Sequence, residues 1–195
     1  MNSRVGGLEG YVPFDQSIEL VKLRIFQPFK DPALPKEKPF PKDLQLAIAN
    51  DLNVYLRQLS YYTAIGSPLD TFHGIDAFIE LDLGDEHFIR ITLDITSDPD
   101  KFKYKADVVI DWPSQGVDRK SEEGIIEWEK ITKKAATDIK KLLEEKAEEM
   151  GLQIHSLNKE ELKKMEDIRE AKRAKESFIQ LPEPSGIRKI KQRVG

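Results

Sequence analysis

Two aspartates in the middle of the chain lie on segments that predict adjacent β-strands. Asp76 belongs to segment 75–82 and Asp94 to segment 89–96, and in both segments apolar residues alternate with mostly polar ones. This period of two is typical of strands with one buried face, and it places both aspartates on the opposite face. The turn at Gly84-Asp85 predicts an antiparallel hairpin. Carboxylates that meet on one face of a hairpin can bind a divalent cation through their oxygens.

The register of this hairpin decides whether the two carboxylates meet, because a slip of one residue moves every side chain to the other face. With a loop at 83–87, the register that turns both apolar sets toward one core places Glu80 opposite Arg90, a favourable pair. The same register places Asp76 opposite Asp94, a pair that is unfavourable unless a cation lies between the carboxylates.

A third alternating segment, 105–111, brings more charged residues to this face. Only eight residues separate it from the second segment, too few for a parallel crossover, so we expect an antiparallel three-stranded meander. In that arrangement Lys105 lies near Thr96, and Asp107 lies near Asp94. One face of the sheet would then gather three aspartates and a lysine.

Helices are expected on either side of the meander. Segment 44–62 has apolar residues at helical spacing after Asp43, which is expected to cap it, and segment 121–150 has a long apolar stripe that ends before Gly151. Segment 152–156 is a candidate for a short fourth strand. The fold class is therefore predicted as α+β, a three-stranded antiparallel meander with this fourth strand, flanked by helices.

Composition divides the chain into four parts. The 195 residues are 39% hydrophobic, which suffices for one modest core. Residues 1–43 hold six of the eleven prolines and are expected to form an N-terminal extension and connector, in which segment 17–26 is either a strand or a short helix. We expect the core at 44–156, a charged helix at 157–180 and a basic mobile tail at 181–195.

Charge and residue usage exclude several classes of protein. The net charge of −4 excludes a globally basic nucleic-acid binder, and residues 67–111, with eleven acidic and four basic side chains, are expected to attract metal ions. The absence of cysteine excludes disulfide scaffolds and thiol nucleophiles, and three scattered histidines argue against a zinc hydrolase. With no signal-peptide pattern and no apolar run of about 20 residues, we expect a cytoplasmic protein without a membrane partner.

The expected order of elements (helix, three-stranded meander, helix, short strand) resembles the αβββαβ core of the PD-(D/E)XK, or restriction-endonuclease-like, nuclease superfamily. The segment His73-Gly74-Ile75-Asp76-Ala77-Phe78, followed by Thr92-Leu93-Asp94-Ile95-Thr96, is similar to the aspartate and the acidic-x-lysine pair that this family carries on adjacent strands. The resemblance covers about residues 44–156. It implies hydrolysis of nucleic-acid phosphodiesters with Mg²⁺ or Mn²⁺ bound by Asp76 and Asp94.

The chain departs from the family pattern at Thr96, which stands in the lysine position. Lys105 on the neighbouring strand is the candidate substitute, so the expected catalytic residues are Asp76, Asp94 and Lys105. In a second alignment, segment 75–83 is the first strand of the family, Asp94 lies on the second, and Asp107 or Asp111 lies on the third. Both alignments keep Asp94 in the site.

The resulting hypothesis is a Mg²⁺-dependent nuclease, or an inactive descendant that binds nucleic acid. The expected metal ligands are Asp76, Asp94 and Asp107, and the expected substrate-binding residues are His73, Thr96, Arg188, Lys189 and Lys191. A competing interpretation is that the aspartates are solvated residues of a half-exposed strand, that Lys105 protects a strand edge and that His73 hydrogen-bonds a turn. The alternative function is a non-catalytic module whose charged helix at 157–180 binds a protein partner.

Overall fold

The computed structural model describes residues 10–24, 27, 39–85, 87–98, 105–154 and 157. The chain divides into two compact units, Met1–Ser156 and Leu157–Gly195, and the architecture below is that of the first unit. Its helical elements are α1 (Phe14–Lys22), α2 (Pro39–Leu52), the 3₁₀ turn η1 (Leu56–Gln58), α3 (Pro68–His73) and α4 (Glu122–Glu149). Its strands are β1 (Leu59–Thr63), β2 (Ala77–Gly84), β3 (His87–Thr96) and β4 (Val108–Asp111).

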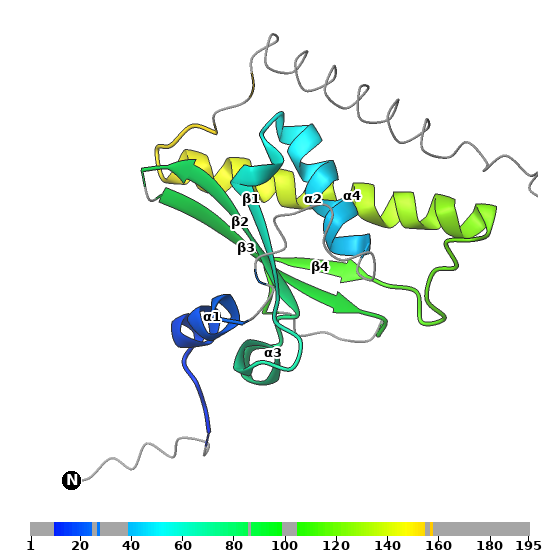
Figure 1. Cartoon of the computed structure of the whole chain (residues 1–195), viewed down its shortest axis with the longest axis horizontal. Coiled ribbons are helices and arrows are strands. Elements are labelled where there is room, and N and C mark those ends of the chain that lie inside the picture. Colours follow the sequence, from blue (N-terminus) through cyan, green and yellow to red (C-terminus); the bar gives the residue numbers. More distant parts are fainter. Residues whose placement is uncertain are drawn as a thin grey trace, which may run out of the picture. The chain divides into compact units, whose positions relative to one another are not determined.

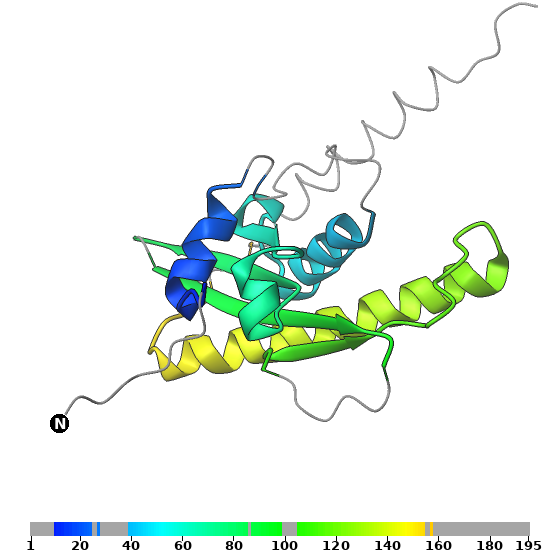
Figure 2. The ribbon, with the colours of Figure 1, turned by 90° about the horizontal axis from the view of Figure 1, so that it is seen from below.

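The four strands form one mixed sheet in the order β1-β2-β3-β4. The first three strands are antiparallel, and β4 pairs in parallel with β3. Helices α2 and α4 cover one face of this sheet, and α1 and α3 lie on the other (Figures 1 and 2). The predicted α+β class is therefore confirmed.

The predicted β2–β3 hairpin is confirmed together with its register. Glu80 pairs with Arg90 and Ile79 pairs with Ile91, so that the alternating apolar residues of both strands face one core. A bulge between Asp82 and Gly84 tightens the turn, because Gly84 already pairs with His87. The strands therefore extend further into the expected loop than the sequence predicts.

The predicted helix over 44–62 is wrong in its second half. The backbone of Asn53 has a φ of 54°, in the left-handed region that ends a helix, and Val54 donates to the carbonyl of Ala49 across this turn. After η1, the segment Leu59–Thr63 pairs with β2 as strand β1. Aromatic residues at helical spacing also fit a strand that is buried on both faces, and tertiary pairing decides between the two.

The antiparallel direction predicted for segment 105–111 is also wrong. Strand β4 is parallel to β3, with Leu93 opposite Val108 and Thr96 opposite Asp111. Strand β4 has only four residues, so its start lies only a short distance back along β3 from Thr96, and the length of segment 97–107 is sufficient to span that distance.

The end of the core departs from the expected αβββαβ order as well. Helix α4 follows β4, begins after the cap Ser121 and ends before Gly151, as predicted, but no strand follows it within the described residues. Residues 152–154 are not in a strand, and 155–156 lie outside the described residues. Most of the predicted charged helix at 157–180 and the whole of the tail at 181–195 lie outside them too.

Both faces of the sheet are buried against helices. On one face, Leu44 and Ile48 of α2 and Ile139 and Leu143 of α4 are fully buried over the apolar residues of β2 and β3. On the other face, a smaller cluster joins α1 and α3 to the sheet; its members are Ile18, Val21, Tyr62, Ala64, Leu69, Ile75 and Phe78. The expectation of a half-exposed polar face is therefore wrong, because α1, from the expected N-terminal extension, packs there.

None of the helices in the described part of the chain is long and apolar enough to cross a bilayer.

Candidate functional site

Asp76 and Asp94 lie together at the end of the β2–β3 ladder that is opposite the hairpin turn. The Asp76 N–H donates to the carbonyl of Leu93 at 2.9 Å, and its Oδ2 accepts the N–H of Ile95 at 2.8 Å. The side chain of Asp76 thus supplies the acceptor that a backbone carbonyl would supply inside the ladder. This hydrogen bond fixes the position of the Asp76 carboxyl group at the sheet end.

The carboxyl group of Asp94 lies close enough to that of Asp76 to raise the pKa of Asp76. Asp94 is only 3% exposed, so its carboxyl group lies almost wholly inside the protein. Two ionised carboxylates that lie close together repel each other, so binding of a proton or a cation at the pair is favourable.

Several groups around Asp76 act on its pKa. Burial raises the pKa of Asp76 above its ordinary value, and the N–H of Ile95 partly opposes this effect. The negative charges of Asp94 and Asp70 raise the pKa further. All three carboxyl groups thus disfavour a second negative charge at the sheet end and favour a positive ion there.

Helix α3 and the turn after it determine where Asp76 enters the sheet. The Oγ of Ser67 caps α3 by accepting the N–H groups of Leu69 at 3.1 Å and Asp70 at 3.4 Å. The helix ends at Gly74, whose φ of 65° is favourable for a residue without a Cβ. Two residues later the chain reaches Asp76 and pairs with β3.

Asp107 does not join this pair. Its Oδ2 accepts the N–H of Thr92 at 2.7 Å and the Thr92 hydroxyl at 2.8 Å, while Lys146 of α4 donates to its Oδ1 at 3.1 Å. Asp107 therefore pairs with β3 just before β4 begins. Burial alone would raise the pKa of Asp107, but the two Thr92 hydrogen bonds and the Lys146 ammonium together lower it below its ordinary value.

The expected gathering of three aspartates around one ion is accordingly not found. Within the residues that the structure describes, no group of three or more His, Asp or Glu side chains could hold a metal ion together. The physical reason is the parallel direction of β4, which takes Asp107 to the free edge of β3. In the second alignment segment 75–83 is the first strand of the family, and in the structure β1 precedes it in the sheet.

Lys105 and Thr96 occupy positions other than those expected. The Lys105 ammonium donates to the carbonyl of Phe72 at 3.3 Å, at the end of α3, since its place beside Thr96 depended on the antiparallel register. The Thr96 hydroxyl accepts the N–H of Asp98 at 3.1 Å, and its carbonyl accepts the N–H of Trp112 at 2.7 Å. Thr96 therefore stabilises the backbone conformation at the end of β3 through these two hydrogen bonds.

His73 is a structural residue at the last position of α3. Its Nε2 lies 2.9 Å from the carbonyl of Val12, and its ring packs 5.7 Å from that of Tyr11 and 5.5 Å from that of Phe14. These contacts join the start of the described chain to α3. The other expected substrate-binding residues, Arg188, Lys189 and Lys191, lie outside the described residues.

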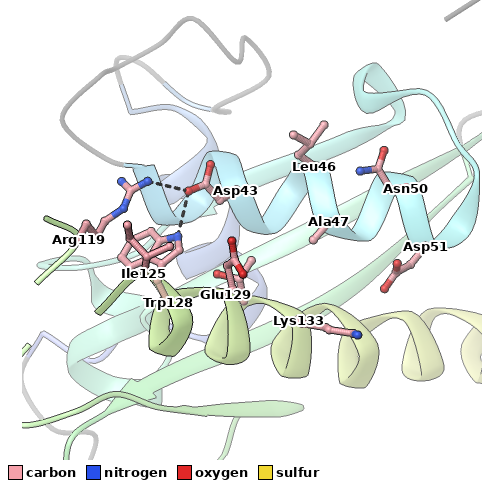
Figure 3. A pocket seen from close by; sticks show the side chains of 11 residues that line it. Asp43, Leu46, Ala47, Asn50, Asp51, Arg119, Ile125, Trp128, Glu129 and Lys133 are labelled. Atoms are coloured by element: carbon pink, nitrogen blue, oxygen red, sulfur yellow. Dashed lines mark hydrogen bonds and ion pairs between the residues drawn. The ribbon is translucent and has the colours of Figure 1, made fainter. Parts of the chain in front are cut away.

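The structure also contains a groove that the sequence analysis missed. It has a volume of about 770 Å³ and lies between α2 and the first half of α4 (Figure 3). At one end Asp43, expected as a helix cap, lies inside α2 and accepts the indole N–H of Trp128 at 3.0 Å and a guanidinium N–H of Arg119 at 3.4 Å. The Arg119 guanidinium also lies 4.3 Å from the centre of the Trp128 ring.

A pattern in the sequence could have indicated this groove. The lining residues of each helix recur at intervals of three and four, which places them on one helical face. On α2 they are Asp43, Leu46, Ala47, Asn50 and Asp51, and on α4 they are Ile125, Trp128, Glu129, Thr132 and Lys133. Both faces mix apolar and charged residues, so a stripe of apolar residues alone does not indicate them.

Comparisons with protein-family models, curated proteins and solved structures found no match.

Proposed function

We propose that this chain is a divalent-cation-dependent hydrolase of nucleic-acid phosphodiesters of the PD-(D/E)XK type, or an inactive descendant that still binds nucleic acid. The observation that carries the proposal is the contact between Asp76 and the buried Asp94 at the ends of adjacent strands. These are the two residues that correspond to the acidic ligands of the family.

The donor set fits a magnesium ion. Mg²⁺ in phosphate-processing enzymes is commonly bound by one or two carboxylates, with water and substrate phosphate completing its shell. Asp76 and Asp94 supply two carboxylates, and Asp70 adds negative charge nearby. A cation between the two carboxylates would remove the repulsion between the ionised groups.

The residues of the chain would have distinct roles in such a site. Asp76 and Asp94 would hold the ion, and the Ile95 N–H would keep the Asp76 carboxylate oriented. When bound, the cation would polarise a phosphoryl oxygen and lower the pKa of a bound water. Because the carboxyl groups repel bare phosphate, substrate would bind only after the cation has reversed the local charge.

Cation-dependent thermal unfolding of the full chain tests this proposal. We expect Mg²⁺ or Mn²⁺ at about 100 times its Kd to stabilise the protein by about 2.7 kcal/mol. The Asp94→Asn variant should lose this response, whereas Asp138→Asn, which removes an exposed carboxylate of α4, should keep it. An equal response of both variants would place the ion elsewhere and contradict the proposal.

Assays with labelled DNA and RNA separate the two branches of the proposal. Cleavage that requires the cation and is lost in Asp94→Asn supports an active nuclease, while binding without cleavage supports an inactive descendant. If the protein neither cleaves nor binds DNA or RNA, both branches of the proposal are contradicted.

A non-catalytic protein-interaction module is the second candidate function. It is favoured by Thr96 in the lysine position and by the contact of Lys105 with Phe72 instead of the carboxyl pair. Full stability without cations, together with a stabilising effect of Asp94→Asn, would favour it over the hydrolase.

A further inference from the structure

The groove between α2 and α4 has the features of an unoccupied helix-binding surface. Its apolar lining includes Leu46 and Ala47 of α2 and Ile125 and Trp128 of α4, and Ile125 is 46% exposed. A groove with an apolar lining is the usual kind of site that accepts an amphipathic helix.

Three polar groups of the groove, on one face of α4, have no side-chain partner among the described residues. The Thr132 hydroxyl is buried there without a hydrogen bond, and burying such a group unpaired is unfavourable. Glu129 and Lys133, one helical turn apart on the same face of α4, form no ion pair with each other or with any other residue in the described part of the chain. Figure 3 shows Asp51 on the opposite wall, toward the end where Lys133 lies.

We propose that the occupant of this groove is α4 of a second copy of the chain, in a two-fold symmetric dimer. In such a dimer the two α4 helices run antiparallel, and each residue meets the same surface of its partner. An axis that passes between Glu129 and Lys133 places the Glu129 carboxylate of each copy opposite the Lys133 ammonium of the other. This face of α4 is therefore electrostatically complementary to the same face of the second copy.

The size of α4 suits this arrangement. It has 28 residues, and at 1.5 Å per residue it is about 42 Å long, so that its first half can extend along a partner while its second half packs on its own sheet. The dimer proposal involves neither Asp76 nor Asp94, so its test is independent of the test of the proposed hydrolase.

Charge reversal in the full chain tests the dimer. Light scattering after gel filtration, over a range of concentrations, should show twice the chain mass of 22.4 kDa for the unaltered protein. Glu129→Lys and Lys133→Glu should each lose the dimer, with a Kd more than about tenfold higher, because like charges then face each other. Both side chains are exposed, and circular dichroism of each variant should be unchanged.

Mixing the two single variants gives the decisive result. Glu129→Lys presents two lysines and Lys133→Glu presents two glutamates, so the mixture should form a heterodimer although neither variant dimerises alone. Lys141→Glu, which reverses an exposed charge elsewhere on α4, should leave the dimer intact. A chain that stays monomeric at every concentration, variants that dimerise like the parent, or a mixture that remains monomeric would overturn the proposal, and the groove would then be assigned to a helix of another protein.

Discussion

The carboxyl group of Asp94 lies close enough to that of Asp76, at the end of two paired strands, to raise the pKa of Asp76, and Asp94 is almost completely buried. Solvent and salt screen the repulsion between carboxylates that are exposed at a protein surface. The buried position of Asp94 reduces this screening, so the electrostatic energy of the pair depends on whether a proton or a cation is bound.

The stability of the protein should depend on pH through Asp76. Its pKa is raised in the folded state above the ordinary 3.8, so the folded protein binds this proton more tightly than the unfolded chain does. The resulting stabilisation is complete below pH 3.8 and is lost as the pH rises through the folded pKa. Asp76→Asn has no ionisable group at this position. In urea unfolding without divalent cations, the free energy of unfolding of this variant should therefore increase relative to that of the parent protein as the pH rises from 3.8 to 7. A difference that is constant with pH would contradict a raised pKa of Asp76 in the folded protein.

Restoring the lysine of the family pattern should increase cleavage. In Thr96→Lys an ammonium group would stand two residues after Asp94, where the family carries the group that assists the attacking water. General acid–base groups contribute roughly 10²–10⁴-fold, so we expect at least about a tenfold gain in Mg²⁺-dependent cleavage of labelled DNA or RNA. Thr96→Met, which has similar bulk and no charge, is the matched control and should give no gain.

The ion-paired Glu80 should be important for anchoring α1. Its Oε1 lies 2.8 Å from Lys22 of α1 and 2.6 Å from Arg90 of β3, and the Glu80 side chain is only 10% exposed. Glu80→Gln leaves two cations without their carboxylate and should cost about 3 kcal/mol in urea unfolding. Lys22→Met should cost clearly less, because Arg90 continues to pair with Glu80. Equal losses in the two variants would argue against a shared carboxylate.

The Thr132 hydroxyl should be a stability defect of the monomer. Since it is buried without a hydrogen bond, Thr132→Val should stabilise the monomer by about 1 kcal/mol in thermal unfolding. Thr137→Val is the matched control on the same helix: its hydroxyl donates to the carbonyl of Lys133 at 3.0 Å on the exposed side, and we expect a change of no more than about 0.5 kcal/mol. A destabilised Thr132→Val would mean that the hydroxyl has a partner in solution.

Local patterns predicted a substantial part of the fold. The β2–β3 hairpin follows from alternating residues around a glycine turn, and its register follows because only one register buries both apolar sets. The pairing of Asp76 with Asp94 is a consequence of that register. Helix α4 was predictable for the same reason, since its cap, its apolar stripe and its glycine stop are all local features.

Tertiary structure alone decided the remaining features. Segment 59–63 has residues compatible with a helix or a strand, and its pairing with β2 is a contact between distant parts of the chain. The direction of β4 relative to β3 is not specified by the local pattern of segment 105–111, and this direction separates Asp107 from the carboxyl pair. The groove depends on how α2 lies beside α4, a relation that neither helix specifies in its own sequence. Periodicity reports which face of an element is buried, whereas the partner that buries it is chosen by packing of the whole chain.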